Sequence, residues 1–139
     1  MSAFERLSDA YCELDHTADW ALEVRGPTLC GALEAAARGM YEMEGADAGP
    51  NPRPIAFDVE ARDDVSRLVG FLSELLYLQE VERSVATDLT VESTVDGLSV
   101  EGEGRDLAGL DKEIKAVTWH AAALERQGDE WIGRVTFDV

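Results

Sequence analysis

Positive charge is scarce in this sequence of 139 residues. Twelve lysines and arginines stand against 29 aspartates and glutamates, so the formal net charge is −17, and the only lysines are Lys112 and Lys115. A chain of this charge repels phosphate backbones, which disfavours tight, direct binding of RNA over a broad surface. The charge favours cations or a basic protein partner instead, although acidity by itself also fits a role in solubility alone.

Cysteine is equally rare, with only Cys12 and Cys30 and no CxxC motif. Two cysteines do not suggest a disulfide framework, and free cysteine is commonly buried, so we interpret both as inert buried thiols. Cys12 and His16 offer two ligand types for zinc, but the second cysteine pair of a typical zinc site is missing. The sequence therefore disfavours zinc.

Long apolar runs are also absent. The longest falls far short of the roughly 20 residues that a membrane-spanning helix needs, and residues 1–6 lack the apolar segment of a signal peptide. We therefore expect a cytoplasmic protein without a membrane partner. Apolar residues still make up 45% of the chain, which suits one folded domain over residues 1–139.

Familiar catalytic motifs are missing as well. The sequence holds no GxSxG, no P-loop, no GxGxxG after a strand and no HExxH. Two histidines, His16 and His120, are too few to assemble a nucleophile with its base and orienting group. We predict that the protein is not an enzyme. A metal-dependent hydrolase is the alternative, although its ligand set would be small and no general base is evident.

Two amphipathic helices are predicted, near residues 28–44 and 64–80. Thr28 can cap the first helix, and Asp63 or Asp64 can cap the second. Apolar residues recur at helical spacing in both segments. These stripes are Leu29, Leu33, Ala36, Met40 and Met43 in the first helix, and Val65, Leu68, Leu72, Leu75 and Leu76 in the second.

Several other segments alternate apolar and polar residues, which is the period of half-buried strands. Strands are predicted at residues 11–14, 20–24, 55–59, 89–95, 98–100, 114–125 and 131–139. Asp96-Gly97 and Gln127-Gly128 are predicted as hairpin turns, and residues 45–54 as a loop rich in glycine and proline. The expected fold class is α+β, with two main helices packed on a mixed, largely antiparallel β-sheet.

The motif Asp15-His16-Thr17-Ala18-Asp19 gathers two carboxylates, an imidazole and a hydroxyl between two predicted strands. Asp19, at the start of a strand, can offer oxygen to a hard cation such as calcium, magnesium or manganese. Chemistry alone favours a simpler alternative, a turn in which Asp15 and Asp19 accept hydrogen bonds from nearby backbone N–H groups.

The chain ends on a second concentration of negative charge. Asp138 sets its side-chain carboxylate next to the α-carboxylate of Val139. Two adjacent anionic groups on an ordered strand repel each other unless a cation or a basic side chain is near. Many C-terminal acids are merely solvated, so this feature is weak evidence by itself.

The predicted hairpin connects the C-terminus to Lys115. A two-residue turn at Gln127-Gly128 places Val117 opposite Asp138 and therefore brings Lys115 diagonally close to Asp138. The same register directs His120 to the opposite face, among apolar neighbours, where a structural role is favoured over a role as a ligand.

Seven segments in a fixed order carry a resemblance to a known family. They are Asp15-His16-Thr17-Ala18-Asp19, Gly26-Pro27-Thr28-Leu29, Ala36-Ala37-Arg38-Gly39-Met40-Tyr41, Phe71 to Leu78, Gly102-Glu103, Ile114 to His120, and Trp131 to Val139. Together they span nearly the whole chain, and in them the sequence resembles the archease family. It departs from the family pattern in a short segment at residues 106–113, which lacks a histidine often seen there, and at Trp119, where tyrosine is expected.

The resemblance implies an accessory protein that activates an RtcB-type RNA ligase in tRNA splicing and RNA repair. It implies promotion of GTP-dependent guanylylation and of repeated turnover, with RNA met only through the ligase. It also implies a metal site at Asp19, Asp138 and Val139, with calcium expected first and magnesium or manganese as alternatives. Lys115, which matches a Lys-Ala segment of the family, and His16 are further functional candidates. A chaperone-like module is another alternative, which would need an exposed apolar patch.

Overall fold

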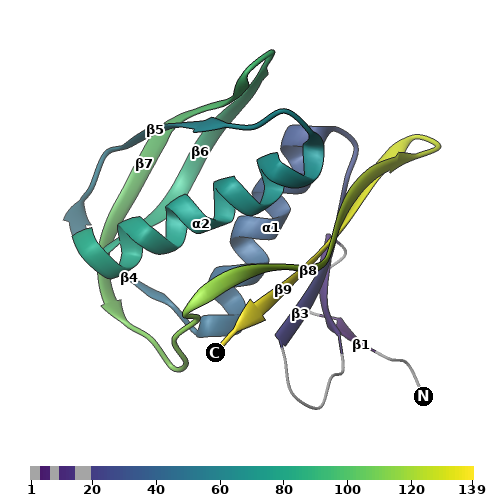
Figure 1. Cartoon of the computed structure of the whole chain (residues 1–139). Coiled ribbons are helices and arrows are strands. Elements are labelled where there is room, and N and C mark those ends of the chain that lie inside the picture. The colour runs from purple at the N-terminus through teal and green to yellow at the C-terminus, as the bar shows by residue number, and fades with distance from the viewer. Residues whose placement is uncertain (1–3, 7–9, 15–19) are drawn as a thin grey trace.

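Two helices lie between two antiparallel β-sheets in this computed structural model, which describes residues 4–6, 10–14 and 20–139 (Figure 1). The first sheet has the strand order β1-β2-β3-β9-β8. Its strands are β1 (Phe4–Arg6), β2 (Tyr11–Leu14), β3 (Trp20–Gly26), β8 (Ala116–Gln127) and β9 (Glu130–Asp138). The strand pairs described are all antiparallel, and the expected α+β class is confirmed.

The second sheet is built around the long strand β7 (Gly97–Gly109). One edge of β7 pairs with β6 (Ser84–Thr94). The other edge of β7 pairs with β5 (Ile55–Glu60) along its first part and with β4 (Asp47–Pro52) along its last part. Residues 45–54 were expected to form a loop, so β4 corrects that prediction. Its pairing with β7 is irregular, and the prolines within it hide the alternation by which a strand is predicted.

Both helices begin where their caps predict. Helix α1 (Leu29–Glu44) starts after Thr28, whose hydroxyl accepts a hydrogen bond from the N–H of Gly31 at 2.9 Å. Helix α2 (Asp64–Glu82) starts after Asp63, whose carboxylate accepts one from the N–H of Ser66 at 2.8 Å. Each cap satisfies an N–H group that has no partner inside its helix, which fixes the first turn.

The core lies where the helices meet the first sheet. Helix α1 packs on β3 and also touches β6, and α2 packs on β8 and touches the second sheet. Phe71 on α2, Leu22 on β3 and Phe137 on β9 are each 0% exposed. One cluster contains residues from both helices and both sheets, so these four elements of the architecture share this core.

The hairpin turns are each displaced by one residue from their predicted positions. Val95-Asp96 joins β6 to β7, and Gly128-Asp129 joins β8 to β9. Gly97 belongs to β7 instead, where its φ is +152° and a side chain would meet the carbonyl oxygen of Val59 at 1.7 Å. This glycine is therefore required by close contact between strands and not by the turn.

Strand β8 also departs from the predicted register, because its turn is displaced and because it contains a bulge. Between the pairs Thr118–Thr136 and Ala123–Arg134, β8 has more residues than β9. Ala121 lies in this stretch with φ +56°.

The bulge changes which residues face one another. Val117 pairs with Phe137 and not, as predicted, with Asp138. The bulge leaves His120 exposed, and Trp119 is 61% exposed. The expectation of a histidine packed among apolar neighbours is therefore wrong.

Candidate functional site

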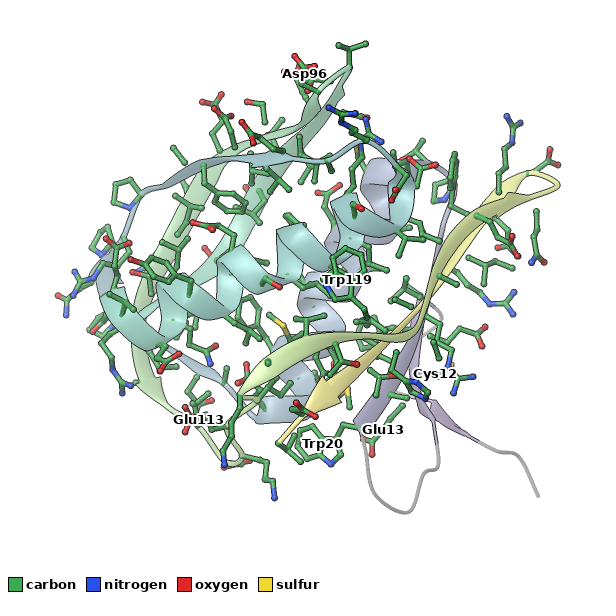
Figure 2. The ribbon with its side chains drawn as sticks, viewed as in Figure 1. Cys12, Glu13, Trp20, Asp96, Glu113 and Trp119 are labelled. Carbon is green, nitrogen blue, oxygen red and sulfur yellow. The ribbon has the colours of Figure 1, made fainter. Side chains whose placement is uncertain are left out.

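Three strand ends meet beside the C-terminus: the start of β3, the end of β9 and the start of β8 (Figure 1). Trp20 pairs with Phe137, and Ala116 pairs with Asp138. Figure 2 shows Trp20 near the end of β9. Trp20 is the residue that follows Asp19 in the sequence, and Phe137 precedes Asp138. The pairing of β3 with β9 thus places Trp20, the chain neighbour of Asp19, opposite Phe137, the chain neighbour of Asp138.

Part of the expected site lies outside the described residues. The motif at residues 15–19 falls there, and with it Asp19, the expected metal ligand, and His16, the further candidate. The described part of the site therefore consists of Asp138, Val139 and Lys115.

Asp138 is exposed at the end of β9, and the three residues that precede it in this strand are buried. Val135 and Phe137 are both 0% exposed and anchor the strand between β3 and β8. Alternation turns Asp138 away from the face of Val135 and Phe137, and Asp138 is exposed at the end of the strand, whereas Thr136 on the same face is buried. Val139 is half-buried and packs against the core cluster, which anchors the terminal residue.

Lys115 is joined to Asp138 through the main chain. Its N–H donates a hydrogen bond to the carbonyl oxygen of Asp138 at 2.8 Å, immediately before β8 begins. Lys115 is exposed. The structure therefore joins the two residues through the main chain only. The expected pairing of Val117 with Asp138, and with it the expected common face of Lys115 and Asp138, is wrong because Ala116 pairs with Asp138.

The described donors of the site are hard oxygen ligands. They are the side-chain carboxylate of Asp138 and the terminal carboxylate of Val139, and such oxygens suit calcium, magnesium or manganese better than softer metals. Within residues 4–6, 10–14 and 20–139, no group of three or more His, Cys, Asp or Glu side chains is placed to hold a metal. The chemistry of these donors fits a hard cation, with Asp19 as the expected further ligand.

One buried acid near this site was not predicted from the sequence. Glu44, in the last turn of α1, is 0% exposed and accepts hydrogen bonds from the side chain of Gln79 at 2.8 Å and the N–H of Ile114 at 3.2 Å. Burial raises the pKa of the Glu44 carboxyl, as does the charge of Glu113, while those two hydrogen bonds lower it. Position 44 lies four residues after Met40, which belongs to the apolar stripe of this helix. That spacing was the signal in the sequence that Glu44 lies on the buried face.

The two thiols are separate features of the fold. Cys12 is buried and Cys30 half-buried, and both are free. Burial raises the pKa of Cys30, which disfavours its reactive thiolate form. Cys12 is confirmed as a buried thiol, whereas Cys30 is only partly enclosed.

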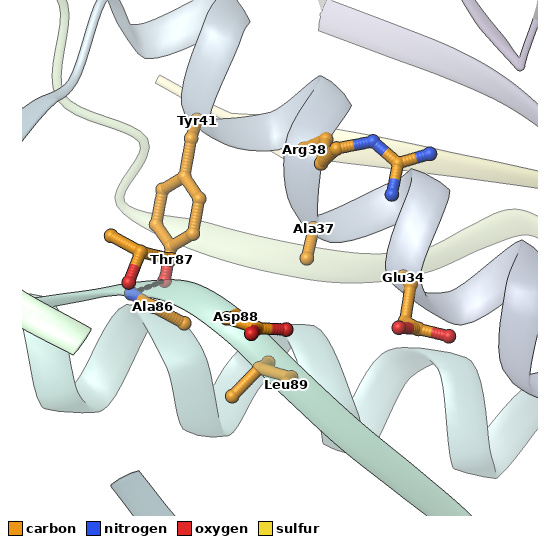
Figure 3. A pocket seen from close by; sticks show the side chains of 8 residues that line it. All are labelled: Glu34, Ala37, Arg38, Tyr41, Ala86, Thr87, Asp88 and Leu89. Atoms are coloured by element: carbon orange, nitrogen blue, oxygen red, sulfur yellow. Dashed lines mark hydrogen bonds between the residues drawn. The ribbon is translucent and has the colours of Figure 1, made fainter. Parts of the chain in front are cut away.

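A recess of about 110 Å³ lies between α1 and β6 (Figure 3). Glu34 and Arg38 line it from the helix, and Asp88 lines it from the strand. Tyr41 lies at one end, where its hydroxyl oxygen accepts a hydrogen bond from the N–H of Ala86 at 3.1 Å, and burial raises its pKa to about 12. The lining mixes both signs of charge and includes none of the candidate site residues Asp138, Val139 and Lys115.

The fold and the strand ends at the C-terminus define an α+β protein in which two helices are held between two antiparallel sheets. Among the described residues, no helix is both long and apolar enough to cross a membrane. The profile of the Archease protein family matches residues 11–139. The chain belongs to the archease family.

Curated relatives agree with this assignment over almost their whole length. A protein named archease from Archaeoglobus fulgidus is 34% identical over 135 residues, covering 93% of this chain and 98% of its own. One from Methanosarcina barkeri is 33% identical over 144 residues, covering 93% of this chain and 95% of its own.

Two solved structures share the fold. The crystal structure of an archease from Thermotoga maritima, described as a possible chaperone, has a TM-score of 0.67 and 25% identity, covering 89% of this chain and 93% of the other. The solution structure of protein 1598 from Methanobacterium thermoautotrophicum has a TM-score of 0.68 and 26% identity, with 100% of both chains covered.

Proposed function

We propose that this protein activates an RtcB-type RNA-splicing ligase and catalyses no reaction of its own. In this role it promotes the GTP-dependent guanylylation of the ligase and its repeated turnover, in tRNA splicing and RNA repair. The ligase is the direct partner, and RNA is met only through it. Membership of the archease family supports the proposal, together with the sequence motifs on which the resemblance rests.

The observation that carries the proposal is the pairing of Trp20 with Phe137. Two acidic segments, separated by more than 100 residues in sequence, each adjoin one member of that pair. Asp19 and Asp138 would together hold a divalent cation, with the terminal carboxylate or carbonyl of Val139 as a further oxygen ligand. Calcium is the first candidate, and magnesium and manganese have the same ligand preference for oxygen.

The residues of this chain would act by holding and presenting charge. The carboxylates would hold the cation at an exposed strand end, where a partner can approach, while the buried Phe137 keeps that end rigid. A bound cation would supply a Lewis-acidic charge for oxygen atoms of a partner or of a phosphate. Lys115, exposed and joined to Asp138 by a main-chain hydrogen bond, would add a positive charge at the same strand end.

A ligation assay under multiple turnover, with the cognate ligase and with or without this protein, tests the proposal. We expect the protein to raise the rate of guanylylation and the number of turnovers without changing which RNA ends are joined. An equal rate and an equal turnover number in both reactions, at saturating protein, would refute the activator role.

A chaperone-like role is the second candidate, favoured by one description and one surface feature. The archease of Thermotoga maritima is described as a possible chaperone. On this chain Tyr77 and Val81 are 54% and 58% exposed, one turn apart on α2. Suppression of the aggregation of an unrelated client, lost in a Tyr77→Ser, Val81→Ser variant, would favour this role over ligase activation.

A further inference from the structure

The last turn of α1 is hydrogen-bonded both to α2 and to the segment between β7 and β8. The Oε2 atom of Glu44 accepts hydrogen bonds from Nε2 of Gln79 on α2 and from the N–H of Ile114. Its main-chain oxygen accepts two more, from the N–H groups of Asp111 at 2.8 Å and Lys112 at 3.1 Å. One buried residue therefore holds three N–H groups of a segment that has no regular structure of its own between β7 and β8.

Two oxygens of this cluster are buried and have no hydrogen-bond partner within the part of the chain that is described. They are Oε1 of Glu44 and Oε1 of Gln79. Both are acceptors when Glu44 is ionised, so neither can satisfy the other. A protonated Glu44 has an O–H donor. The amide oxygen of Gln79 can accept from that O–H, while the amide N–H of the same side chain already donates to Oε2 of Glu44. Protonation thus allows the cyclic pairing of a carboxylic acid with an amide.

The cluster is one residue away from the C-terminal site. Glu44 binds the N–H of Ile114, and the next N–H, of Lys115, donates to the carbonyl oxygen of Asp138. Ile114 is itself 3% exposed, so its side chain fixes the same point from the core side. A shift of Ile114 would therefore move Lys115 relative to Asp138.

We propose that Glu44 is a positioning residue for the C-terminal site: held as a neutral acid paired with Gln79, it fixes Ile114 and so the contact between Lys115 and Asp138. The consequence for a ligase rests on the proposed function. The consequence for the segment at residues 111–115 does not.

The surroundings of Glu44 favour the neutral form. The titratable and charged residues near it are Tyr41 on α1 and Asp111, Lys112 and Glu113 in the segment before β8, while α2 contributes the uncharged Gln79. Burial and the charge of Glu113 raise the pKa of Glu44 in the folded protein. A raised folded pKa stabilises the fold fully below the unfolded pKa, and this stabilisation is lost as pH rises through the folded pKa.

Three variants of the full chain test the proposal. Glu44→Gln imitates the neutral acid, because its amide can donate to Oε1 of Gln79 and its oxygen can still accept from Ile114. Glu44→Leu fills a similar volume but removes the acceptor. The exchanged pair Glu44→Gln, Gln79→Glu returns one carboxyl to the cluster. The measurements are melting temperature against pH, amide hydrogen exchange at Ile114 and Lys115, and ligase stimulation for each variant.

We expect the wild type to lose melting temperature relative to Glu44→Gln as pH rises, and the exchanged pair to regain that pH dependence. In Glu44→Leu we expect exchange at Ile114 and Lys115 to be about tenfold faster than in Glu44→Gln, as for the loss of one hydrogen bond. Stimulation should fall in Glu44→Leu and be retained in Glu44→Gln. Should Glu44→Leu fail to fold, the comparison of Glu44→Gln with the exchanged pair still decides whether the carboxyl of this cluster is protonated in the folded protein.

Two results would overturn the inference. One is the same pH dependence of melting temperature in wild type and Glu44→Gln. The other is full stimulation by a folded Glu44→Leu protein whose Lys115 amide exchanges faster. A wild type that does not stimulate the ligase refutes the proposed function instead, and the exchange data still decide whether Glu44 fixes the segment.

Discussion

The N–H of Lys115 donates to the carbonyl oxygen of Asp138 at 2.8 Å, and this bond lies at the end of the pairing between β8 and β9. It ties the residue before β8 to the last residue of β9, so the main chain holds Lys115 at the strand end where Asp138 is exposed. Because the bond uses only main-chain atoms, it does not involve the side-chain carboxylate of Asp138.

Alanine at the acidic positions should remove ligase stimulation while the fold survives. Asp19→Ala and Asp138→Ala, and deletion of Val139, would each remove an oxygen ligand of the proposed cation site. Because Asp138 is exposed, its replacement leaves no core cavity, and its effect on stability should be about 0.5 kcal/mol or less. Guanylylation rate and melting temperature, measured together for each variant, check this.

The matched control for these variants is Asp129→Ala. Asp129 is an exposed acid in the turn at the opposite end of β9, so its replacement changes the net charge equally. It should leave stimulation unchanged. Equal losses of stimulation in Asp129→Ala and Asp138→Ala would point to overall charge, and full stimulation by a folded Asp19→Ala protein would count against the cation site.

Calcium should stabilise the wild type and not the Asp138→Ala variant. A ligand that binds only the folded state raises stability by about 2.7 kcal/mol at a concentration one hundred times its dissociation constant. The check is melting temperature across a calcium titration, reversed with a chelator, with magnesium and manganese compared in parallel. An equal rise in the Asp138→Ala protein would place the bound ion elsewhere on this acidic chain.

Local patterns predicted the helices well because their signals lie within a few residues. Thr28 and Asp63 each combine a capping oxygen with an apolar stripe that follows at once, and both helices start at these caps. Strand register was less predictable. It depends on the bulge around Ala121, a residue whose positive φ no local motif announces.

The site was predictable only in part, for a related reason. Asp138 and Lys115 were found from charge and family resemblance, but the bond between them depends on the bulged register of β8. Glu44 was overlooked because a glutamate in a last helical turn usually faces solvent. Its burial depends on Gln79 and Ile114, which are 35 and 70 residues away in sequence.

Gly97→Ala should be one of the most damaging single-methyl changes in this chain. A Cβ at Gly97 would meet the carbonyl oxygen of Val59 at 1.7 Å, and the backbone there has φ +152°. We expect a loss of roughly 2–4 kcal/mol in the free energy of unfolding, from overpacking and backbone strain together. Gly109→Ala, where nothing lies within 4 Å of the added carbon, is the control and should change stability little. Urea unfolding of both variants decides the point, and similar midpoints would show that β5 and β7 separate at little cost.

Asp63 should make the start of α2 sensitive to acid. The N–H and the side chain of Ser66 donate to the Asp63 carboxylate and lower its pKa below the usual range, so the folded state prefers the ionised form. A lowered folded pKa gives stabilisation that is present above the unfolded pKa and is lost as pH falls through the folded pKa. Asp63→Asn keeps a capping oxygen but cannot ionise, so the wild type should melt higher than the variant near neutral pH, and the difference should close in acid. The measurement is the melting temperature of both proteins from neutral pH downward.

Thr28→Ala serves as the comparison at α1, with a loss of about 1 kcal/mol at every pH, because its hydroxyl cap on Gly31 does not titrate. A difference between wild type and Asp63→Asn that stays constant down to the lowest pH would show that the charge of Asp63 contributes nothing to the cap.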